Sequence, residues 1–335
     1  MKDPICSLVI PVYNEEAVLP ALYKRLTDVM SRSGVSYEIL LVNDGSRDRS
    51  WEMMLELRAA DPHVSLLNLS RNFGHQIAIT AGVEHAQGQA VVVLDADLQD
   101  PPEVVLEMLE KWREGYDVVY GLRTQREGES IFKRSTAAAF YRLLRRLTSI
   151  EIPVDTGDFR LMSRRVVESM KHLREQHRFV RGLVAWLGFR QIGVKYQRAR
   201  REAGETKYPL RKMIRFAIDA MVSFSFVPLR LATLAGIVIS CVSFAYALVA
   251  VYAHFYMPQA VSGWASIMVA ILFLGGVQLI FLGIIGEYLG RVYDEVKGRP
   301  LYLFQDLKQG PPDALVAQED NKKAAAVAGE LEFYI

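Results

Sequence analysis

Short apolar runs alternate with amphipathic helical patterns over the first 120 residues of the chain. Strands are predicted at residues 7–12, 37–43, 64–69, 90–94 and 117–121, and helices near 17–33, 49–60, 74–87 and 103–114. This alternation predicts an α/β domain with a mostly parallel sheet that is covered by helices on both faces. Ligands of such sheets bind beyond the carboxyl ends of the strands, so the residues that follow each strand are the candidates for chemistry.

The pattern becomes mixed after residue 121. It predicts a basic helix at 131–147, a further stretch at 156–162, helices up to about 187 and a strand near 189–196. Residues 208–226 repeat apolar positions at helical spacing, while Arg211, Arg215 and Asp219 share another face. That pattern is typical of a helix lying in a membrane interface. An amphipathic helix packed on the soluble domain is the alternative interpretation.

Residues 231–286 contain no Lys, Arg, Asp or Glu, although 23% of the chain is charged. Segments 231–253 and 264–286 are each long enough to cross a bilayer, which takes about 20 apolar residues. Pro258 and Gly263 interrupt the connection between them. A buried helical hairpin in a large soluble core is the alternative, which two such spans in tandem disfavour.

Basic residues flank this apolar stretch on both sides, with Arg211, Lys212, Arg215 and Arg230 before it and Arg291, Lys297 and Arg299 after it. The positive-inside rule then places both ends of the hairpin in the cytoplasm. The first residues show no signal-peptide pattern. We therefore expect a multi-pass protein of the inner (cytoplasmic) membrane, with its α/β domain and both termini cytoplasmic.

Four segments follow from these patterns: an α/β domain at 1–207, a juxtamembrane amphipathic helix at 208–226, a transmembrane hairpin at 227–290 and a cytoplasmic C-terminal segment at 291–335. The end of this last segment is expected to be disordered or extraneous to the natural protein. The net charge is only +2, but residues 198–215 hold seven basic and two acidic side chains. Such a segment suits anionic headgroups or a lipid phosphate. Nucleic acid is disfavoured, because no recognition motif accompanies it.

Carboxylates follow the predicted strand at 90–94. Asp95 and Asp97 form an Asp-x-Asp (DxD) motif, which presents oxygen ligands to one hard divalent cation, Mg²⁺ or Mn²⁺, together with substrate phosphates. A solvated turn is the alternative. Polar residues also close the first two strands, at 13–16 and 43–46, where they could read a base and a ribose. Asp44 is a candidate acceptor for a base imide N–H.

Five motifs stand out in the chain: Pro-Val-Tyr-Asn-Glu-Glu (11–16), Asn-Asp-Gly-Ser (43–46), Ser-Arg-Asn-Phe-Gly-His (70–75), Asp-Ala-Asp-Leu-Gln-Asp-Pro-Pro-Glu (95–103) and Gly-Asp-Phe-Arg-Leu-Met (157–162). Together they resemble family 2 glycosyltransferases of the polyprenyl-phosphate type, which include dolichyl-phosphate mannose synthase and the bacterial polyisoprenyl-phosphate glucosyltransferases. The resemblance covers roughly residues 5–307, and residues 285–302 are most similar to the bacterial branch with a two-helix anchor.

The resemblance implies a GT-A fold, a divalent metal and inverting transfer from a nucleotide sugar to a lipid phosphate. By motif, the nucleotide contacts are Pro11, Tyr13, Glu15 and Asp44. Asp95 and Asp97 would serve the ribose, the metal and the diphosphate, and Arg123 would meet a donor or acceptor phosphate. Asp158 stands where the family's catalytic base is usually assigned.

A phosphate monoester has a second pKa of about 6, so an acceptor of this class is largely dianionic at neutral pH. It has no proton to lose and therefore needs no strong base. We therefore expect Asp158 to orient a substrate and to stabilise positive charge at the anomeric carbon. An ion pair with Arg160 is the structural alternative. Arg134, Arg201 and Lys207 are the favoured ligands of the acceptor phosphate, since Arg and Lys both bind phosphate. His75 either lines the donor pocket or serves the fold.

The favoured reaction is transfer of glucose from UDP-glucose to undecaprenyl phosphate or a related polyprenyl phosphate. The same chemistry with GDP-mannose or a UDP-aminopentose derivative is the first alternative. A processive polysaccharide synthase is a further alternative. Such an enzyme has more transmembrane helices and usually a Gln-x-x-Arg-Trp motif, and the sequence shows neither. A non-catalytic lipid carrier or flippase component is the alternative of another class. A homo-oligomer is expected, with a tetramer as one option.

Overall fold

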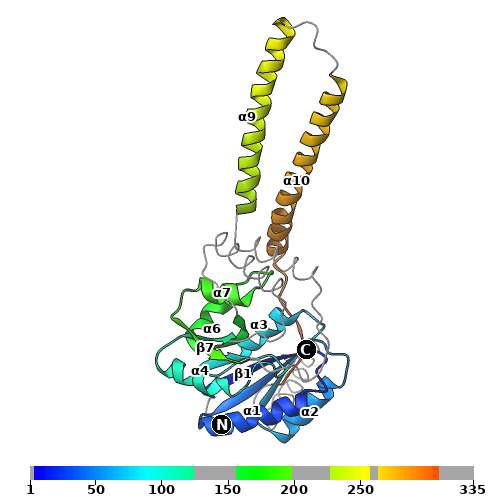
Figure 1. Cartoon of the computed structure of the whole chain (residues 1–335). Coiled ribbons are helices and arrows are strands. Elements are labelled where there is room, and N and C mark those ends of the chain that lie inside the picture. Colours follow the sequence, from blue (N-terminus) through cyan, green and yellow to red (C-terminus); the bar gives the residue numbers. More distant parts are fainter. Residues whose placement is uncertain (1–3, 124–155, 198–226, 257–262, 309–335) are drawn as a thin grey trace, which may run out of the picture. The chain divides into compact units, whose positions relative to one another are not determined.

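The computed structural model describes residues 4–123, 156–197, 227–256 and 263–308. These residues belong to two units, an α/β unit that includes residues 300–308 and a pair of long helices (Figure 1). The predicted helices at 131–147 and 208–226 lie outside the described residues.

The α/β unit is built on one eight-stranded sheet in the order β7-β5-β6-β4-β1-β2-β3-β8. Its strands are β1 (Cys6–Val12), β2 (Tyr37–Asn43), β3 (Val64–Leu69), β4 (Ala90–Val93), β5 (Val118–Arg123), β6 (Thr156–Ser163), β7 (Gln191–Tyr196) and β8 (Phe304–Lys308). Strand β1 pairs in parallel with β2 and β4, β2 with β3, and β5 with β7. Strand β6 runs antiparallel between β4 and β5, and β8 runs antiparallel to β3. The prediction of a mostly parallel sheet is confirmed.

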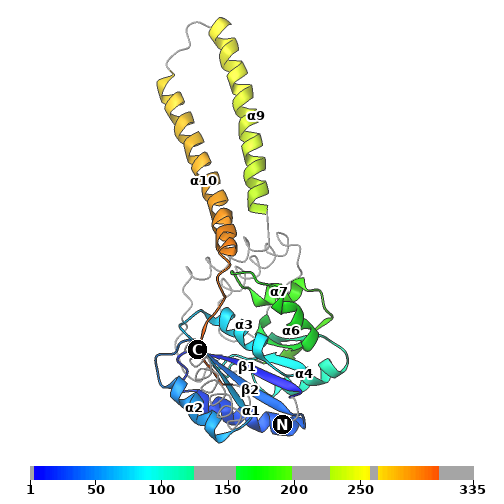
Figure 2. The same cartoon turned by 180° about the vertical axis from the view of Figure 1, so that it is seen from behind.

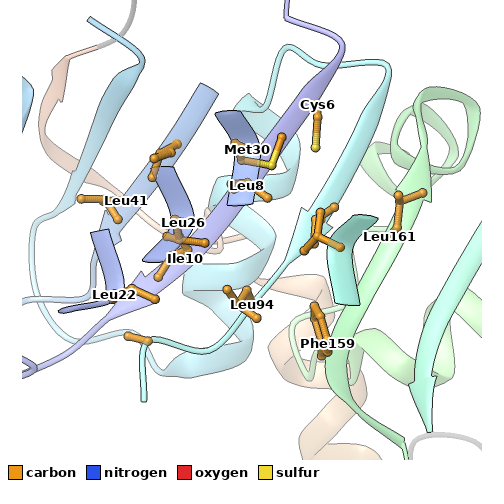
Figure 3. Packing of buried hydrophobic residues seen from close by; sticks show 14 of the residues in the cluster. Cys6, Leu8, Ile10, Leu22, Leu26, Met30, Leu41, Leu94, Phe159 and Leu161 are labelled. Carbon is orange, nitrogen blue, oxygen red and sulfur yellow. The ribbon is translucent and has the colours of Figure 1, made fainter. Parts of the chain in front are cut away.

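Helices cover both faces of this sheet, as the sequence pattern predicts (Figures 1 and 2). They are α1 (Leu19–Ser33), α2 (Ser50–Ala60), α3 (His75–His85), α4 (Val104–Arg113), α6 (Arg164–Lys171) and α7 (Val180–Trp186). Leu8 and Ile10 of β1 pack with α1, α2 and α4, while Val9 faces α3, α6 and α7. All three side chains are buried, which explains why β1 reads as a continuous apolar run. Figure 3 shows Leu8 and Ile10 against Leu22, Leu26 and Met30 of α1.

The final strand, β8, is an element that the sequence patterns do not predict. It pairs with the outer edge of β3, and Arg58 Nη1 donates to the Lys308 carbonyl at 2.8 Å. Just before it, the Tyr302 hydroxyl donates to Glu84 Oε2 at 2.6 Å, and Ser70 N donates to the Leu303 carbonyl at 2.8 Å. The chain thus returns after the long helices to complete the sheet.

The second unit contains the helices α9 (Val227–Tyr256) and α10 (Trp264–Val296). They include the two predicted spans, and Leu229–Tyr246 and Phe273–Val296 are long and apolar enough to cross a membrane. The described residues bury neither window: Leu279 is 71% exposed and Phe244 is 67% exposed. The predicted pair of apolar helices near the C-terminus is confirmed.

Candidate active site

The ends of β1 and β2 bring together the four side chains assigned to the nucleotide. Pro11 pairs with Val42 in the sheet register, and Asp44 N donates to the Val12 carbonyl at 2.9 Å. Proline is compatible with this central strand because β4 pairs with β1 only as far as Val9. Tyr13 is 43% exposed and Glu15 is half-buried, so both have side-chain surface accessible to a ligand.

The loops after β1 and β2 are tied to each other by hydrogen bonds. Asn14 N donates to Ser46 Oγ at 3.1 Å, and Asn14 Oδ1 accepts from Arg47 N at 2.8 Å. Asn14 has a φ of 55°, in the left-handed region that asparagine tolerates better than most residues. Non-glycine residues in that region are typical of sites where the surrounding structure fixes a special backbone shape. These hydrogen bonds join the two loops into one side of the candidate nucleotide site.

Asp44 fixes the segment that leads into α3. Its Oδ1 accepts from Phe73 N at 2.7 Å, and its Oδ2 accepts from Gly74 N at 3.0 Å. Burial raises the pKa of Asp44, although these two hydrogen bonds oppose the shift. At Gly45 a Cβ would lie 2.5 Å from Asn72 N, so this close approach requires glycine. Each carboxylate oxygen keeps a further lone pair, and recognition of a base by Asp44 remains a prediction.

Asp95 and Asp97 follow β4, where the sequence places them. Oδ1 of Asp95 is buried, accepts no hydrogen bond from any described residue, and lies 3.3 Å from His75 Nε2. Burial raises the pKa of Asp95 to about 6, with His75 opposing and Asp158 adding to the shift. Asp97 Oδ1 accepts from Gln99 N at 3.1 Å, across a turn in which Leu98 has a φ of 55°.

These two carboxylates fit a cation that also binds a substrate. A buried carboxylate oxygen that lacks a hydrogen bond is costly, and a divalent cation offers it a partner. Within the described part of the chain, no group of three or more His, Cys, Asp or Glu side chains could hold a metal. Mg²⁺ characteristically binds one or two carboxylates and completes its shell with water and substrate phosphates, which matches a site of two aspartates.

Asp158 lies on β6 and is 5% exposed. Its carboxylate accepts from Arg181 Nε at 2.8 Å and from Gln76 Nε2 at 2.9 Å, and it lies 3.4 Å from His75 Nε2. Burial alone would raise the pKa of Asp158, but the charge of Arg181 and hydrogen bonds from His75 and Arg181 hold it well below its ordinary value. Asp158 is therefore a fixed anion.

Arg181 forms a close ion pair with Asp158, its Nε lying 2.8 Å from Asp158 Oδ1, whereas Arg160 was the partner named in the structural alternative. Arg160 Nη2 donates to the Gly157 carbonyl at 3.0 Å, and burial lowers its pKa to about 10. His75 Nε2 approaches both Asp95 and Asp158, so this side chain links the predicted metal pair to the third carboxylate. Burial lowers the pKa of His75, but Asp158 and Asp95 raise it further, and the net shift is upward.

Arg123 ends β5, and its guanidinium lies beside Gly157, the residue before Asp158. Its Nε donates to the Tyr196 hydroxyl at 3.1 Å, and its Nη2 lies 3.6 Å from Asp100 Oδ2. Tyr196 in turn donates to the fully buried Asp100. A Cβ at Gly157 would lie 2.5 Å from Arg123 Nη2, so the guanidinium packs on the backbone next to Asp158. The predicted phosphate ligand is thus held in place from two sides.

The structure brings eight of the predicted site residues to the carboxyl-end side of the sheet: Pro11, Tyr13, Glu15, Asp44, Asp95, Asp97, Arg123 and Asp158. The remaining three, Arg134, Arg201 and Lys207, lie outside the described residues and stay predictions. Sequence reasoning missed Gln76, Asp100, Arg181 and Tyr196. Asp100 was within reach, since it belongs to the quoted motif at 95–103.

The sequence matches two family models. The model described as glycosyl transferase family 2 matches residues 7–170, and the model described as GtrB C-terminal hairpin matches residues 227–292. The first match and the observed sheet confirm the predicted GT-A fold.

Several proteins are similar to this chain along most of its length. A Bacillus subtilis protein named uncharacterized glycosyltransferase YkcC is 55% identical over 299 residues, which cover 89% of this chain and 93% of that protein. The bactoprenol glucosyl transferase of Shigella phage SfII is 42% identical over 306 residues, 91% of this chain and 99% of that protein. A glucosyl-3-phosphoglycerate synthase structure from Mycobacterium tuberculosis, solved with Mn²⁺, UDP and glucosyl-3-phosphoglycerate, gives a TM-score of 0.41 at 18% identity and covers 65% of this chain and 78% of that one.

Proposed function

Because this chain belongs to glycosyl transferase family 2, we propose that it transfers glucose from UDP-glucose to a polyprenyl phosphate at the cytoplasmic face of the membrane. The observation that carries the proposal is the approach of Asp95 and Asp158 to the same nitrogen of His75, at the end of the sheet where α/β enzymes bind their ligands. The bactoprenol glucosyl transferase of phage SfII, 42% identical over 306 residues, supports the sugar and the acceptor class.

The reaction is a single displacement. An oxygen of the acceptor phosphate attacks the anomeric carbon of glucose, the bond from that carbon to the UDP oxygen breaks, and the configuration inverts. Mg²⁺ or Mn²⁺ bound by Asp95 and Asp97 would supply positive charge for the departing diphosphate. We propose Arg123 as a phosphate ligand, and its packing on Gly157, next to Asp158, supports this role.

Asp158 acts in this reaction as a fixed negative charge. Its pKa is held well below the ordinary value by Arg181 and His75 despite burial, which makes it a weak proton acceptor. The acceptor phosphate, with a second pKa of about 6, is largely dianionic at neutral pH and has no proton to lose. Asp158 therefore orients a substrate and stabilises the positive charge that develops on the sugar.

The membrane supplies the acceptor. Helices α9 and α10 carry exposed apolar surface along their candidate spans, and basic residues flank them in the sequence. We place both ends of this hairpin and the α/β unit in the cytoplasm, following the positive-inside rule. Arg134, Arg201 and Lys207 are the proposed ligands of the acceptor phosphate, and we propose a homo-oligomer as the working form.

The test is an assay of the full-length protein with labelled UDP- and GDP-sugars and a polyprenyl phosphate, with and without Mg²⁺ or Mn²⁺. We expect label from UDP-glucose to enter the lipid fraction only with the cation. Transfer from GDP-mannose or from a UDP-aminopentose instead would reassign the donor. Absence of cation-dependent transfer from every donor would contradict the proposal and favour a non-catalytic lipid carrier.

A further inference from the structure

Besides His75, two side chains from different helices contact the carboxylate of Asp158 and form what we call the Asp158 clamp: Arg181 and Gln76. Arg181, from α7, donates from Nε to Asp158 Oδ1 at 2.8 Å and from Nη2 to Oδ2 at 3.4 Å. Gln76, from α3, donates from Nε2 to Oδ2 at 2.9 Å. Both oxygens of the carboxylate are therefore occupied from defined directions, which fixes its rotation as well as its position.

The same two side chains also join the elements that surround Asp158. Gln76 Oε1 accepts from Val180 N at 3.0 Å, so one amide links α3, the carboxylate and the start of α7. Arg181 Nη1 donates to the carbonyl of Thr156 at 2.8 Å, two residues before Asp158 on β6. Each clamping residue thus contacts the carboxylate and, with a second polar atom, the backbone of a neighbouring element.

In the proposed transfer reaction, these contacts of Arg181 and Gln76 would keep the Asp158 carboxylate in the orientation that catalysis requires. The positive charge on the sugar develops at one carbon, and a carboxylate stabilises it only from a set distance and direction. A displacement of about 1 Å in such a group can cost about 10²-fold in rate. Arginine gives directional contacts with a carboxylate through its planar guanidinium, which the ammonium of lysine does not.

We infer that Arg181 and Gln76 are positioning residues that hold Asp158 in its reactive orientation. This inference rests on the proposed glycosyl transfer and adds two residues to it. Arg181 is separated from Asp158 by 23 positions and Gln76 by 82, and neither belongs to a motif quoted for the family resemblance.

The contrasting role for Arg181 is direct binding of the acceptor phosphate. Its side chain is 23% exposed, so part of it is accessible to a substrate. The two roles predict different kinetics. A positioning residue acts on kcat through Asp158, whereas a phosphate ligand acts on the KM for the polyprenyl phosphate.

The experiment compares Arg181→Gln, Arg181→Lys and Gln76→Leu with wild type, in the full-length protein, using UDP-glucose and a polyprenyl phosphate. Lys171→Gln, which removes a cation from the neighbouring helix α6, and Gln89→Leu, at an exposed position, are the matched controls. For Arg181→Gln we expect kcat to fall by about 10- to 100-fold, with both KM values within about 3-fold of wild type. Arg181→Lys should recover part of the loss, and the controls should match wild type.

A double-mutant cycle with Asp158→Asn gives the sharper test. If Arg181 acts through Asp158, Arg181→Gln should add little to the loss already caused by Asp158→Asn. Additive losses would overturn the inference, and so would a raised acceptor KM with kcat unchanged. Gln76→Leu removes the other half of the clamp, so it decides the question if Arg181→Gln does not fold.

Hydrogen exchange separates failure of this inference from failure of the proposed function. Protection of residues 156–163 should decrease in Arg181→Gln and Gln76→Leu but not in the two controls. If wild type transfers no sugar yet these residues lose protection, the proposed function fails and the clamp stands. If wild type is active and neither clamp variant changes kcat or protection, the clamp is refuted.

Discussion

The α/β unit and the helical pair use the same apolar residue types in opposite ways. Leu40 and Leu66 of the sheet are 0% exposed, whereas Leu279 of α10 is 71% exposed and Leu282 is 62% exposed. The sheet finds its apolar surroundings within the chain, in the helices on its two faces. No described residue buries the candidate spans of the helical pair, and exposed apolar surface of this extent marks a partner or a membrane. The described part of the first region buries its own apolar core, whereas the second region requires an apolar environment from outside.

Charge follows the reverse distribution. The α/β unit buries ionisable groups close to one another, Asp158 and Arg160 among them, while residues 231–286 contain no Lys, Arg, Asp or Glu. Buried charges are tolerated where partners compensate them, and within lipid they are avoided unless they serve a function. Chemistry is therefore expected in the α/β unit and anchoring in the helices.

The largest expected effect is a loss of activity without a loss of stability, caused by a substitution in the α/β unit. Asp97→Ala should reduce glucosyl transfer by about 10³-fold or more, because charge stabilisation by the bound cation contributes several kcal/mol. EDTA should reproduce the loss in the wild type, and added Mn²⁺ should reverse it there. The melting temperature should stay near that of wild type. Asp28→Ala, at an exposed site on α1, is the control, and a fully active Asp97→Ala would contradict the metal assignment.

Two leucine-to-alanine substitutions, one in each region, test whether the α/β unit and the helical pair use apolar side chains differently. Leu40→Ala, in the buried strand β2, should lower the free energy of unfolding by about 2–5 kcal/mol through lost burial and a cavity. Leu279→Ala should change the unfolding of the α/β unit by less than about 0.5 kcal/mol, as is usual for substitutions at exposed positions. Denaturant titration in detergent measures both. Equal losses at the two positions would mean that Leu279 is part of a protein core.

A charge placed in the hairpin tests its lipid environment. Leu279 lies within both the predicted span 264–286 and the candidate span Phe273–Val296. Leu279→Arg should oppose membrane insertion by up to about 3 kcal/mol, the cost of a charge near the centre of a transmembrane helix. Carbonate extraction should then release more protein than for Leu279→Ala. If both variants stay fully membrane-bound, the second helix does not cross the bilayer at this residue.

The smallest effect concerns the outer surface of the α/β unit. Arg25 Nε and Nη2 each donate to Glu103 at 2.8 Å, between α1 and the start of α4. Exposed ion pairs contribute about 0.2–1 kcal/mol, so Arg25→Ala should lower the melting temperature slightly. The coupling energy measured with Glu103→Gln should fall as salt is added, since salt screens exposed charges. A coupling that is large and independent of salt would show this contact to be more than a surface pair.

The sequence predicts the strand ends well because two local signals coincide there. Buried parallel strands read as apolar runs, and polar residues with turn preferences follow them, as at Asn43–Asp44 and at Asp95. Since parallel strands bring their carboxyl ends to one edge, the pattern predicts Tyr13, Asp44 and Asp95 on the same side of the sheet. The two long apolar helices were equally predictable, from length and absence of charge.

Contacts between distant segments were beyond such patterns. The pairing of Asp158 with Arg181 and Gln76 depends on how α7 and α3 pack beside β6, and no periodicity encodes that. Arg160, two residues from Asp158 on the same strand, is the alternative partner that the sequence suggests. Its Nη2 donates to the Gly157 carbonyl, and its charge adds to the lowering of the Asp158 pKa without a close ion pair. The sequence patterns also do not predict strand β8. It is only five residues long, which is too short for a clear hydrophobic pattern, and it pairs with the distant strand β3.

The position of β8 in the chain has a consequence for the order of assembly. Asn68 of β3 faces Asp306 of β8, although 238 residues separate them. During synthesis the outer edge of β3 stays without this neighbour until both long helices have left the ribosome. An unpaired edge is a site of unwanted strand pairing, and contacts of such long sequence separation form slowly. The last step in forming the sheet, the pairing of β8 with β3, can therefore occur only after both helices of the hairpin have been synthesised. A sheet that contains β8 implies that the complete anchor has already been made.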